Sequence, residues 1–464
     1  MVSHSLKSRG CLSRFRWFPP NAGSRPESLS TRMIEAPQST SPILRGVVCL
    51  ALALGLSHGT AASETQSHSP NARPIEDPSG QAMRGFYESL ARAFQGEWVS
   101  RILHYGDSHV AADILTGGLR RDLQLCFGAA GPGFVLPGRP WPGYSRPGVI
   151  SETSGGWHVD GLTEGSLAAD GRLGLAGVSL TARAAGEWIT VTAAASYFEV
   201  YVLKQPGGGS IEVLLDGVTR ERTYSLSSGA SEAVCLEVVA DSGSVHTLEI
   251  RTKSAGRTRI FGVAIERNSA GVVYDALGIN GARASRPLRW DSRVFVASLE
   301  RRDPDLIIVA YGSNEVSDVD LDLDEYRVSL TSLLNLFHEA APRASILVIG
   351  PPDRAVRVRG NWKTIGRLSA LVGAQRQAAF EAGAAFFDLF NAMGGPGSIE
   401  RWARQNPPLA QPDRVHLTSP GYKTVADWLY RALMHGYLQS SAVKASACCL
   451  PSTDPVSVGA RLEG

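Results

Sequence analysis

The sequence has little net charge and few cysteines, and each shortage excludes a class of function. Its 464 residues carry 46 Lys and Arg against 44 Asp and Glu, a formal net charge of +2. A balance this even provides no general electrostatic attraction to nucleic acid or to an anionic membrane surface. The six cysteines match neither the spacing of a zinc site nor a dense disulfide framework. Hydrophobic residues make up an ordinary 43%, so we expect a globular chain with a buried core.

Long apolar runs are also scarce, and the one that stands out lies near the N-terminus. Residues 42–57 place Arg45 before an apolar centre, and small residues follow up to Ala62. This order is typical of a secretory signal peptide cleaved near Ala62, with Met33 as a plausible start; a single-span membrane anchor is the alternative. No later run is long enough to cross a membrane. We therefore expect a periplasmic or secreted protein without stable membrane insertion after signal cleavage.

Export bears on the cysteines, because disulfides persist in oxidising compartments. Cys448 and Cys449 are adjacent in the C-terminal tail. Either could pair with Cys126 or Cys235, or all four could be buried or incidental thiols.

Two patterns alternate along the rest of the chain. From Gln81 to Phe127, apolar residues at helical spacing surround a short strand, which opens an α/β unit. From Val149 to Asn268, short strand-like runs are separated by Gly, Ser and Asp clusters, as in a β-sandwich or jelly roll. Near-continuous apolar strands then alternate with helical stretches, which suits a parallel sheet.

The sequence thus predicts an α/β fold, a parallel sheet flanked by helices, interrupted by an inserted β-sandwich. The expected parts are an N-terminal extension and signal peptide at 1–62, the first α/β part at 63–148, the sandwich at 149–268, the second α/β part at 269–437 and a disordered tail at 438–464.

Gly106-Asp107-Ser108 lies between a predicted strand and a predicted helix. Residues 102–105 form an apolar run, Gly106 permits a sharp turn, and 109–127 have helical spacing. A serine at this place, among the free amides of a helix start, is well placed as a nucleophile. Taken alone, the tripeptide is better explained as a surface turn.

A serine hydroxyl attacks esters poorly unless a base takes its proton and a third group holds that base in one tautomer. Asp413-Arg-Val-His416 offers both groups in a loop just before a predicted helix. The carboxylate can fold back onto one ring nitrogen while the other faces Ser108. A surface turn is again the alternative.

Two further loops offer hydrogen-bond donors for the oxyanion of acyl transfer. Gly312-Ser313-Asn314-Glu315 follows the apolar strand at 305–310, so the Asn314 amide comes at a strand's carboxyl end. Gly278-Ile-Asn-Gly281 follows the apolar run 272–274, and a glycine amide can approach a ligand closely. Separately, an Asx turn and a plain loop explain these two segments equally well.

Together, and in this order, the four blocks resemble those of the SGNH (GDSL) hydrolases, which are named for their Ser, Gly, Asn and His. The resemblance covers about 95–130 and 270–437. It implies that Ser108 is the nucleophile, His416 the general base and acid, and Asp413 the residue that orients it.

The resemblance also implies an oxyanion hole made of the Ser108 and Gly281 amides and the Asn314 side chain. Gly278, three residues earlier, is the alternative to Gly281. The reaction relies on a base, a nucleophile and fixed dipoles, so we expect no metal and no organic cofactor.

Two positions depart from the usual family pattern. His109 replaces the Leu that follows the serine, and Glu315 replaces the Asp that follows the asparagine. With the runs 104–113, 131–137 and 278–282, the chain looks like the Ape-type peptidoglycan O-acetylesterases, in which a sandwich resembling a carbohydrate-binding module is inserted. This implies a serine esterase that removes O-acetyl groups from a cell-envelope polysaccharide, above all the MurNAc 6-O-acetyl groups of peptidoglycan.

Three alternatives remain open from the residues. The same machinery could serve an O-acetyltransferase, or a lipase or thioesterase. In a non-catalytic glycan-binding protein, Trp157, Trp188 and Tyr201 could stack on sugar rings, although aromatic residues in sandwiches more often belong to the core.

The Arg-rich segment 354–359 could meet an anionic glycan, but a solvated loop is expected.

Overall fold

The computed structural model describes residues 74–163, 170–240 and 243–442, all within one compact unit of the chain. The expected signal peptide and the tail beyond residue 442 lie outside the described residues. Among those described, no helix is both long enough and apolar enough to cross a membrane. Cys126 is disulfide-bonded and Cys235 is a free thiol; Cys448 and Cys449 are outside the described residues.

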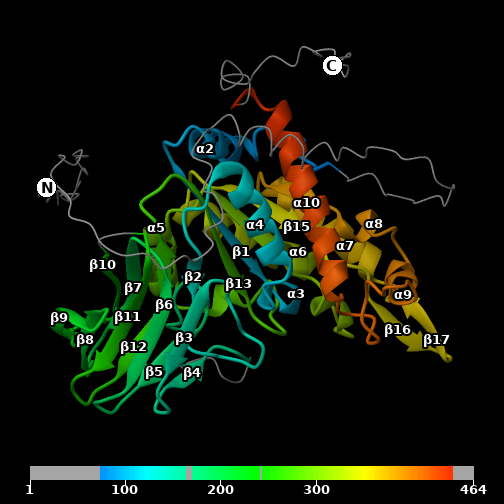
Figure 1. The fold of residues 1–464 in the computed structure, drawn as a ribbon. Coiled ribbons are helices and arrows are strands. Elements are labelled where there is room, and N and C mark those ends of the chain that lie inside the picture. Colours follow the sequence, from blue (N-terminus) through cyan, green and yellow to red (C-terminus); the bar gives the residue numbers. More distant parts are fainter. Residues whose placement is uncertain (1–73, 164–169, 241–242, 443–464) are drawn as a thin grey trace, which may run out of the picture. The chain divides into compact units, whose positions relative to one another are not determined.

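A parallel five-stranded sheet forms the centre of the α/β part (Figure 1). Its strands are, in spatial order, β13 (Gly271–Gly278), β1 (Val99–Gly106), β14 (Leu306–Ala310), β15 (Ser345–Ile349) and β18 (Ala385–Phe387). β1 comes first in the chain, yet it lies between β13 and β14. The sheet is therefore assembled from segments on both sides of the sandwich in sequence.

Helices cover both faces of this sheet, which explains why its strands are apolar at nearly every position. Neighbouring residues of one strand face opposite sides: Ile102 packs in one hydrophobic cluster and Leu103 in the other. The first face is covered by α2 (Arg84–Phe94), α4 (Leu115–Phe127) and α10 (Ser419–Gln439), and the second by α5 (Ser292–Arg302), α6 (Leu323–Ala340) and α7 (Leu368–Glu381). Shorter helices are α3 (Ser108–Ala111), α8 (Leu389–Ala392), α9 (Ser398–Ala403) and the 3-10 turns η2 (Pro287–Arg289) and η3 (Glu315–Ser317).

The inserted domain consists of two antiparallel sheets. One has the order β10-β7-β12-β5-β4 with β2 also paired to β12, and the other has the order β3-β6-β11-β8-β9. Burial alternates along β6, as expected for a strand with one face on the core. The strands are β2 (Gly133–Val135), β3 (Val149–Thr153), β4 (His158–Asp160), β5 (Ser179–Ala182), β6 (Trp188–Ala194), β7 (Tyr197–Lys204), β8 (Ser210–Leu215), β9 (Val218–Ser225), β10 (Glu232–Val239), β11 (Val245–Thr252) and β12 (Thr258–Glu266).

The Arg-rich segment 354–359 is exposed from residue 356 on, as the sequence suggested, but it is not a loop. It enters a β-hairpin of β16 (Ala355–Val358) and β17 (Asn361–Thr364). Arg359 and Gly360 at the turn have φ values of 50° and 85°, the left-handed pair that a two-residue hairpin turn requires. The Arg357 guanidinium lies over the Trp362 ring at 5.1 Å, so this arginine is held against the hairpin.

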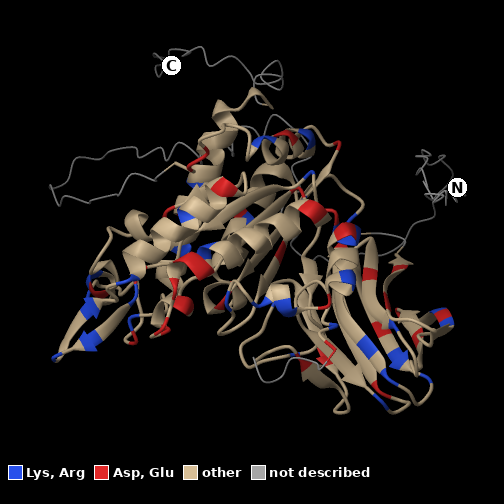
Figure 2. Cartoon of the chain, turned by 180° about the vertical axis from the view of Figure 1, so that it is seen from behind, with Lys and Arg blue, Asp and Glu red and all other residues tan. Residues whose placement is uncertain are grey.

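A buried network of charges joins the sandwich to the α/β sheet. Arg302 at the end of α5 donates to Asp275 of β13 at 2.6 and 3.1 Å and also to Glu266 of β12. Arg101 of β1 donates to the same Glu266 at 2.9 and 2.8 Å. The side chains of Arg302, Glu266 and Asp275 are at most 1% exposed. We call these four residues the junction network; elsewhere acidic and basic residues are mixed within both the sandwich and the α/β part (Figure 2).

Candidate active site

Three loops of the predicted site leave the same edge of the sheet. Gly106, at the end of β1, pairs in register with Gly278 of β13 and with Ala310 of β14. Because the strands are parallel, the segments that follow them emerge side by side, where α/β proteins bind ligands. These segments contain Ser108, the turn with Gly281, and Asn314.

Ser108 begins a one-turn helix directly after β1. The Asp107 carbonyl accepts the amides of Val110 and Ala111 at 3.1 and 3.0 Å, and its carboxylate accepts the His109 amide at 2.9 Å. The turn is so tight that a Cβ on Gly106 would come within 2.5 Å of Val110 Cγ2. Only glycine fits there, which gives the Gly-Asp-Ser order a steric reason.

Ser108, His416 and Asp413 form a continuous hydrogen-bonded chain. Ser108 Oγ lies 2.9 Å from His416 Nε2, and His416 Nδ1 lies 2.7 Å from Asp413 Oδ2. The other carboxylate oxygen accepts the amides of Val415 and His416, each at 3.0 Å. A carboxylate held in this way fixes the tautomer with a proton on Nδ1, so Nε2 can accept the serine proton.

Asp413 is a carboxylate that stays charged although its environment is partly dry. Partial burial pushes its pKa upward, but the hydrogen bonds from the His416 ring and from the two amides outweigh this effect, so the pKa lies below its ordinary value. The side chains of His416 and Asp413 are 40% and 47% exposed. The Asp413 carboxylate is therefore ionised, and both side chains are accessible from solvent.

Asn314 connects the two remaining loops. It precedes η3, and its side-chain Nδ2 donates to the Ala282 carbonyl at 2.9 Å. Ala282 in turn closes a turn by donating to Ile279 O at 3.1 Å, and Gly281 lies inside that turn with φ of +73°. The Asn314 amide and the Gly281 turn are thus in direct contact.

Gly278 and Gly281 have different surroundings. Gly278 is buried at the end of β13, and a Cβ there would lie 2.4 Å from the Ala111 amide nitrogen. Gly281 is exposed, with nothing within 4 Å of a Cβ position. Open space therefore adjoins the Gly281 turn, whereas Gly278 is enclosed.

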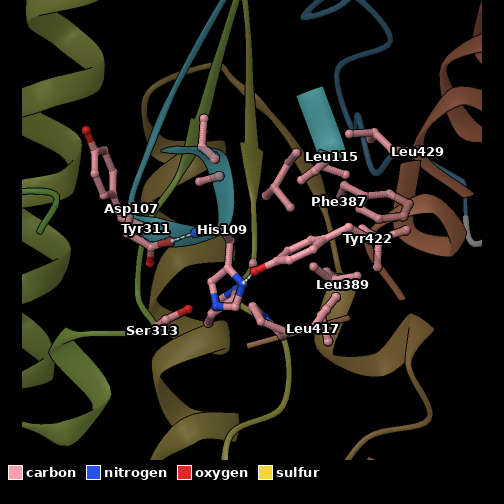
Figure 3. Close-up of a pocket in the computed structure, with 17 residues that line it drawn as sticks. Asp107, His109, Leu115, Tyr311, Ser313, Phe387, Leu389, Leu417, Tyr422 and Leu429 are labelled. Carbon is pink, nitrogen blue, oxygen red and sulfur yellow. Dashed lines mark hydrogen bonds between the residues drawn. The ribbon is translucent and has the colours of Figure 1, made fainter. Parts of the chain in front are cut away.

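Two residues near the site were not assigned a role from the sequence. His109 Nδ1 lies 3.0 Å from the Tyr422 hydroxyl (Figure 3). The His109 ring lies 5.5 Å from that of His416 between centroids, with the two rings tilted by 40°. Burial lowers the pKa of His109, so its ring is neutral. The only signal for His109 was its departure from the family's leucine; Tyr422, in the first turn of α10, gave none.

Behind these rings lies a narrow, mostly apolar cavity. His109 and Asp107 border it, and Figure 3 shows the Tyr422 hydroxyl directed at the His109 ring. The cavity is lined further by side chains from the ends of β14, β15 and β18 and from α10, among them Tyr311, Ile349, Phe387, Val425 and Leu429.

The aromatic residues considered for sugar stacking separate into two kinds. Tyr201 is 2% exposed and belongs to the core beside β12. Trp157 and Trp188 are half-buried, and Trp157 Nε1 donates to the Trp188 carbonyl at 3.0 Å. Among the described residues, no three or more His, Cys, Asp and Glu side chains are grouped so that they could hold a metal ion.

Comparison with known proteins agrees with this geometry. Residues 249–424 match the model of the GDSL-like lipase/acylhydrolase family, a range that contains the Gly281, Asn314 and His416 blocks but begins after Ser108. A solved peptidoglycan O-acetylesterase is 26% identical, covers 79% of this chain and 99% of its own, and gives a TM-score of 0.67. Residues 249–424 thus have the sequence of a GDSL-like lipase/acylhydrolase. The family match and the esterase structure together support a carboxylic ester hydrolase, so the predicted resemblance, fold class and class of enzyme are confirmed.

More distant structures include two family two carbohydrate esterases. That from Clostridium thermocellum is 11% identical and covers 62% of this chain and 98% of its own, with a TM-score of 0.27. That from Cellvibrio japonicus is 14% identical over the same shares, with a TM-score of 0.25. No curated protein matches the chain.

Proposed function

We propose that this protein is an acetylesterase that removes O-acetyl groups from peptidoglycan, with the MurNAc 6-O-acetyl group as its substrate. The observation that carries the proposal is the hydrogen-bonded chain from Ser108 through His416 to Asp413, at 2.9 and 2.7 Å. The likeness to a peptidoglycan O-acetylesterase over 99% of that chain supports the choice of substrate.

In the proposed reaction, Ser108 Oγ attacks the acetyl carbonyl carbon while His416 Nε2 takes the hydroxyl proton. Negative charge develops on the carbonyl oxygen, and the amides of Ser108 and Gly281 and the Asn314 side chain stabilise it. The C–O bond to the sugar then breaks, and the sugar oxygen leaves with the proton from His416. An acetyl-serine remains.

Water completes the cycle. His416 removes a proton from the water as its oxygen attacks the acetyl-serine, and the Ser108 oxygen then leaves with that proton from His416, which restores the serine hydroxyl and releases acetic acid, ionised to acetate. The charge on Asp413 stabilises the imidazolium at both stages. Each step needs only the nucleophile, the base and fixed hydrogen-bond donors.

The test is acetate release from O-acetylated peptidoglycan and from acetylated xylan, with the Ser108→Ala variant as the blank. We expect release from peptidoglycan to be at least ten times faster than from xylan, and none above background in the variant. Equal rates would reduce the assignment to a carbohydrate acetylesterase. Activity retained by a folded Ser108→Ala protein would contradict the serine mechanism.

The same experiment separates the other candidates. An O-acetyltransferase would transfer acetyl groups to added glycan faster than it releases acetate, and a lipase would prefer long acyl chains. A protein that binds peptidoglycan and releases no acetate from it would be the non-catalytic wall protein.

The proposed substrate lies outside the cytoplasmic membrane, so we also propose that the protein is periplasmic or secreted. The sequence around residues 42–62 supports this. N-terminal sequencing of the exported protein should find a start just after Ala62, and an uncleaved cytoplasmic protein would contradict the proposal.

A further inference from the structure

Glu315 is a buried carboxylate beside the active site that the reaction described above does not use. It follows Asn314, where the family usually has Asp, and begins η3. The residue is only 4% exposed. A buried carboxylate has to be hydrogen-bonded, because an unpartnered charge in a dry place is very unfavourable.

Its two oxygens bind the two loops next to the serine. Oε1 accepts the Ala284 amide at 2.8 Å, and Oε2 accepts the Gly312 amide at 3.0 Å. Ala284 lies three residues after Gly281, and Gly312 lies two residues before Asn314. One carboxylate therefore spans the loop that follows β13 and the loop that follows β14.

A second bond runs between the same loops in the opposite direction. Asn314 Nδ2 donates to Ala282 O at 2.9 Å, while Ala284 donates to Glu315. Asn314 and Glu315, neighbours in the loop after β14, thus bind one carbonyl and one amide of the loop after β13. This pairing leaves the Gly281 turn little freedom to move away from Asn314.

We propose that Glu315 is a positioning residue of the oxyanion hole: it fixes the Gly281 amide and the Asn314 side chain relative to each other by bridging their loops. This rests on the proposed function of the site. Glu315 acts through the two loops and not on the substrate, so its loss weakens transition-state stabilisation more than substrate binding.

The surroundings of Glu315 are electrostatically unfavourable, which argues against a role in stability alone. Burial and, to a smaller extent, the negative charge of Asp107 raise its pKa to about 7. The phenols of Tyr311 and Tyr326 face it as well. A charge kept in such a place is explained by the two amides that only a carboxylate can accept together.

The experiment compares Glu315→Gln with Asp318→Asn. Glutamine has the size of glutamate but offers one acceptor oxygen, and its NH₂ group meets the second amide as donor against donor. Asp318 forms a salt bridge with Arg283 at 2.7 Å and so links the same two loops at the surface. The Asp318 and Arg283 side chains are 42% and 35% exposed. Asp318→Asn is therefore a matched control.

For Glu315→Gln we expect kcat on a chromogenic acetate ester to fall roughly 10- to 100-fold, less than the loss of a whole oxyanion donor. KM should change less than twofold, and the inhibition constant of a boronic acid that mimics the tetrahedral intermediate should rise by the same factor as kcat falls. Asp318→Asn should leave all three values within twofold of the original.

An unchanged kcat in folded Glu315→Gln, or a rise in KM alone, would overturn the positioning role. If Glu315→Gln does not fold, Glu315→Asp keeps the charge but is one methylene too short to reach both amides, and the same split between kcat and KM is expected. An original enzyme that releases no acetate would instead contradict the proposed function itself.

Discussion

The junction network and the active site each contain a buried carboxylate, but the pKa values of these two carboxylates are shifted in opposite directions. Glu266 at the junction accepts hydrogen bonds from two arginines, and although burial pushes its pKa upward, Arg302 and Arg101 outweigh this and hold the pKa well below its ordinary value. Glu315 accepts two backbone amides, and its pKa is raised to about 7. A full positive charge nearby keeps a buried carboxylate ionised, whereas neutral amides leave it close to protonation.

The difference follows from what each region has to do. The junction has to hold the sandwich against β1 and β13 in one arrangement, so its charges are paired with one another and, apart from the partly exposed Arg101, fully buried. The site has to let charge appear and disappear on Ser108 and His416, so arginine salt bridges to Asp413 would work against proton transfer. Asp413 is accordingly held by a histidine ring and amides, with its side chain 47% exposed.

The largest effect is expected for Asp413→Asn, which should lower activity without changing stability. Asp413→Asn keeps an oxygen for the two amides but presents an NH₂ group to the His416 ring, which favours the wrong tautomer. We expect kcat to fall by about 10³- to 10⁴-fold, with a melting temperature within about 2 °C of the original, since the side chain is exposed. Ester hydrolysis and thermal unfolding measure the two quantities. A loss of less than tenfold would show that Asp413 does not orient the base.

At the junction network we expect a substitution to lower the stability of the protein. Arg302→Met removes the arginine that pairs with Asp275 and one of the two arginines that pair with Glu266. Breaking a buried ion pair in this way lowers the free energy of unfolding by about 3 to 5 kcal/mol. The control is Arg343→Met, which removes an exposed pair with Asp303 and should cost less than about 1 kcal/mol. Urea unfolding measures both, and equal losses would mean that burial does not set the strength of these pairs.

The two carboxylates should also differ in how stability depends on pH. Because the folded pKa of Glu315 is raised from 4.5 to about 7, its contribution to stability is fully present below pH 4.5 and is lost as pH rises through 7. The advantage of the original protein over Glu315→Gln should therefore shrink by roughly 3 kcal/mol between pH 4.5 and 8. Unfolding free energies at several pH values test this. A constant difference would mean that Glu315 does not titrate in this range.

The smallest effect concerns the rings beside the base. Tyr422→Phe removes one hydrogen bond to His109, worth about 1 kcal/mol between neutral groups, so we expect a two- to tenfold loss of kcat. His109→Leu, which introduces the family's usual residue, should lose at least as much because the contact with the His416 ring disappears. Steady-state kinetics of both variants provide the measurement. A gain in kcat for His109→Leu would show that the histidine does not support the base.

Local patterns in the sequence were sufficient for the strands of the parallel sheet and for much of the sandwich. The predicted strand at 102–105 lies within β1, and the one at 305–310 matches β14 to within one residue. β12 has no alternating pattern of its own, because it is buried along its whole length and carries Arg259 and Glu266. The β16–β17 hairpin was missed because the exposure of its arginines, which the structure shows, was interpreted as a loop.

At the site, the four blocks had local signatures, whereas the contacts between them did not. Ser108 and His416 are 308 residues apart, and His109 and Tyr422 are 313 apart. The junction network is similar, because Arg101, Asp275 and Arg302 are ordinary charged residues with no common spacing. Only the fold shows that these charges pair.

The place of β1 in the sheet has a consequence for the order of folding. β1 pairs on one side with β13 and on the other with β14, and both are synthesised only after the whole sandwich. A strand with no partner cannot hold a tight turn, so the chain emerging from the ribosome keeps Ser108 unformed until the sandwich has passed. His416 comes later still, just before α10. The catalytic residues can therefore come together only after the chain has been synthesised as far as His416.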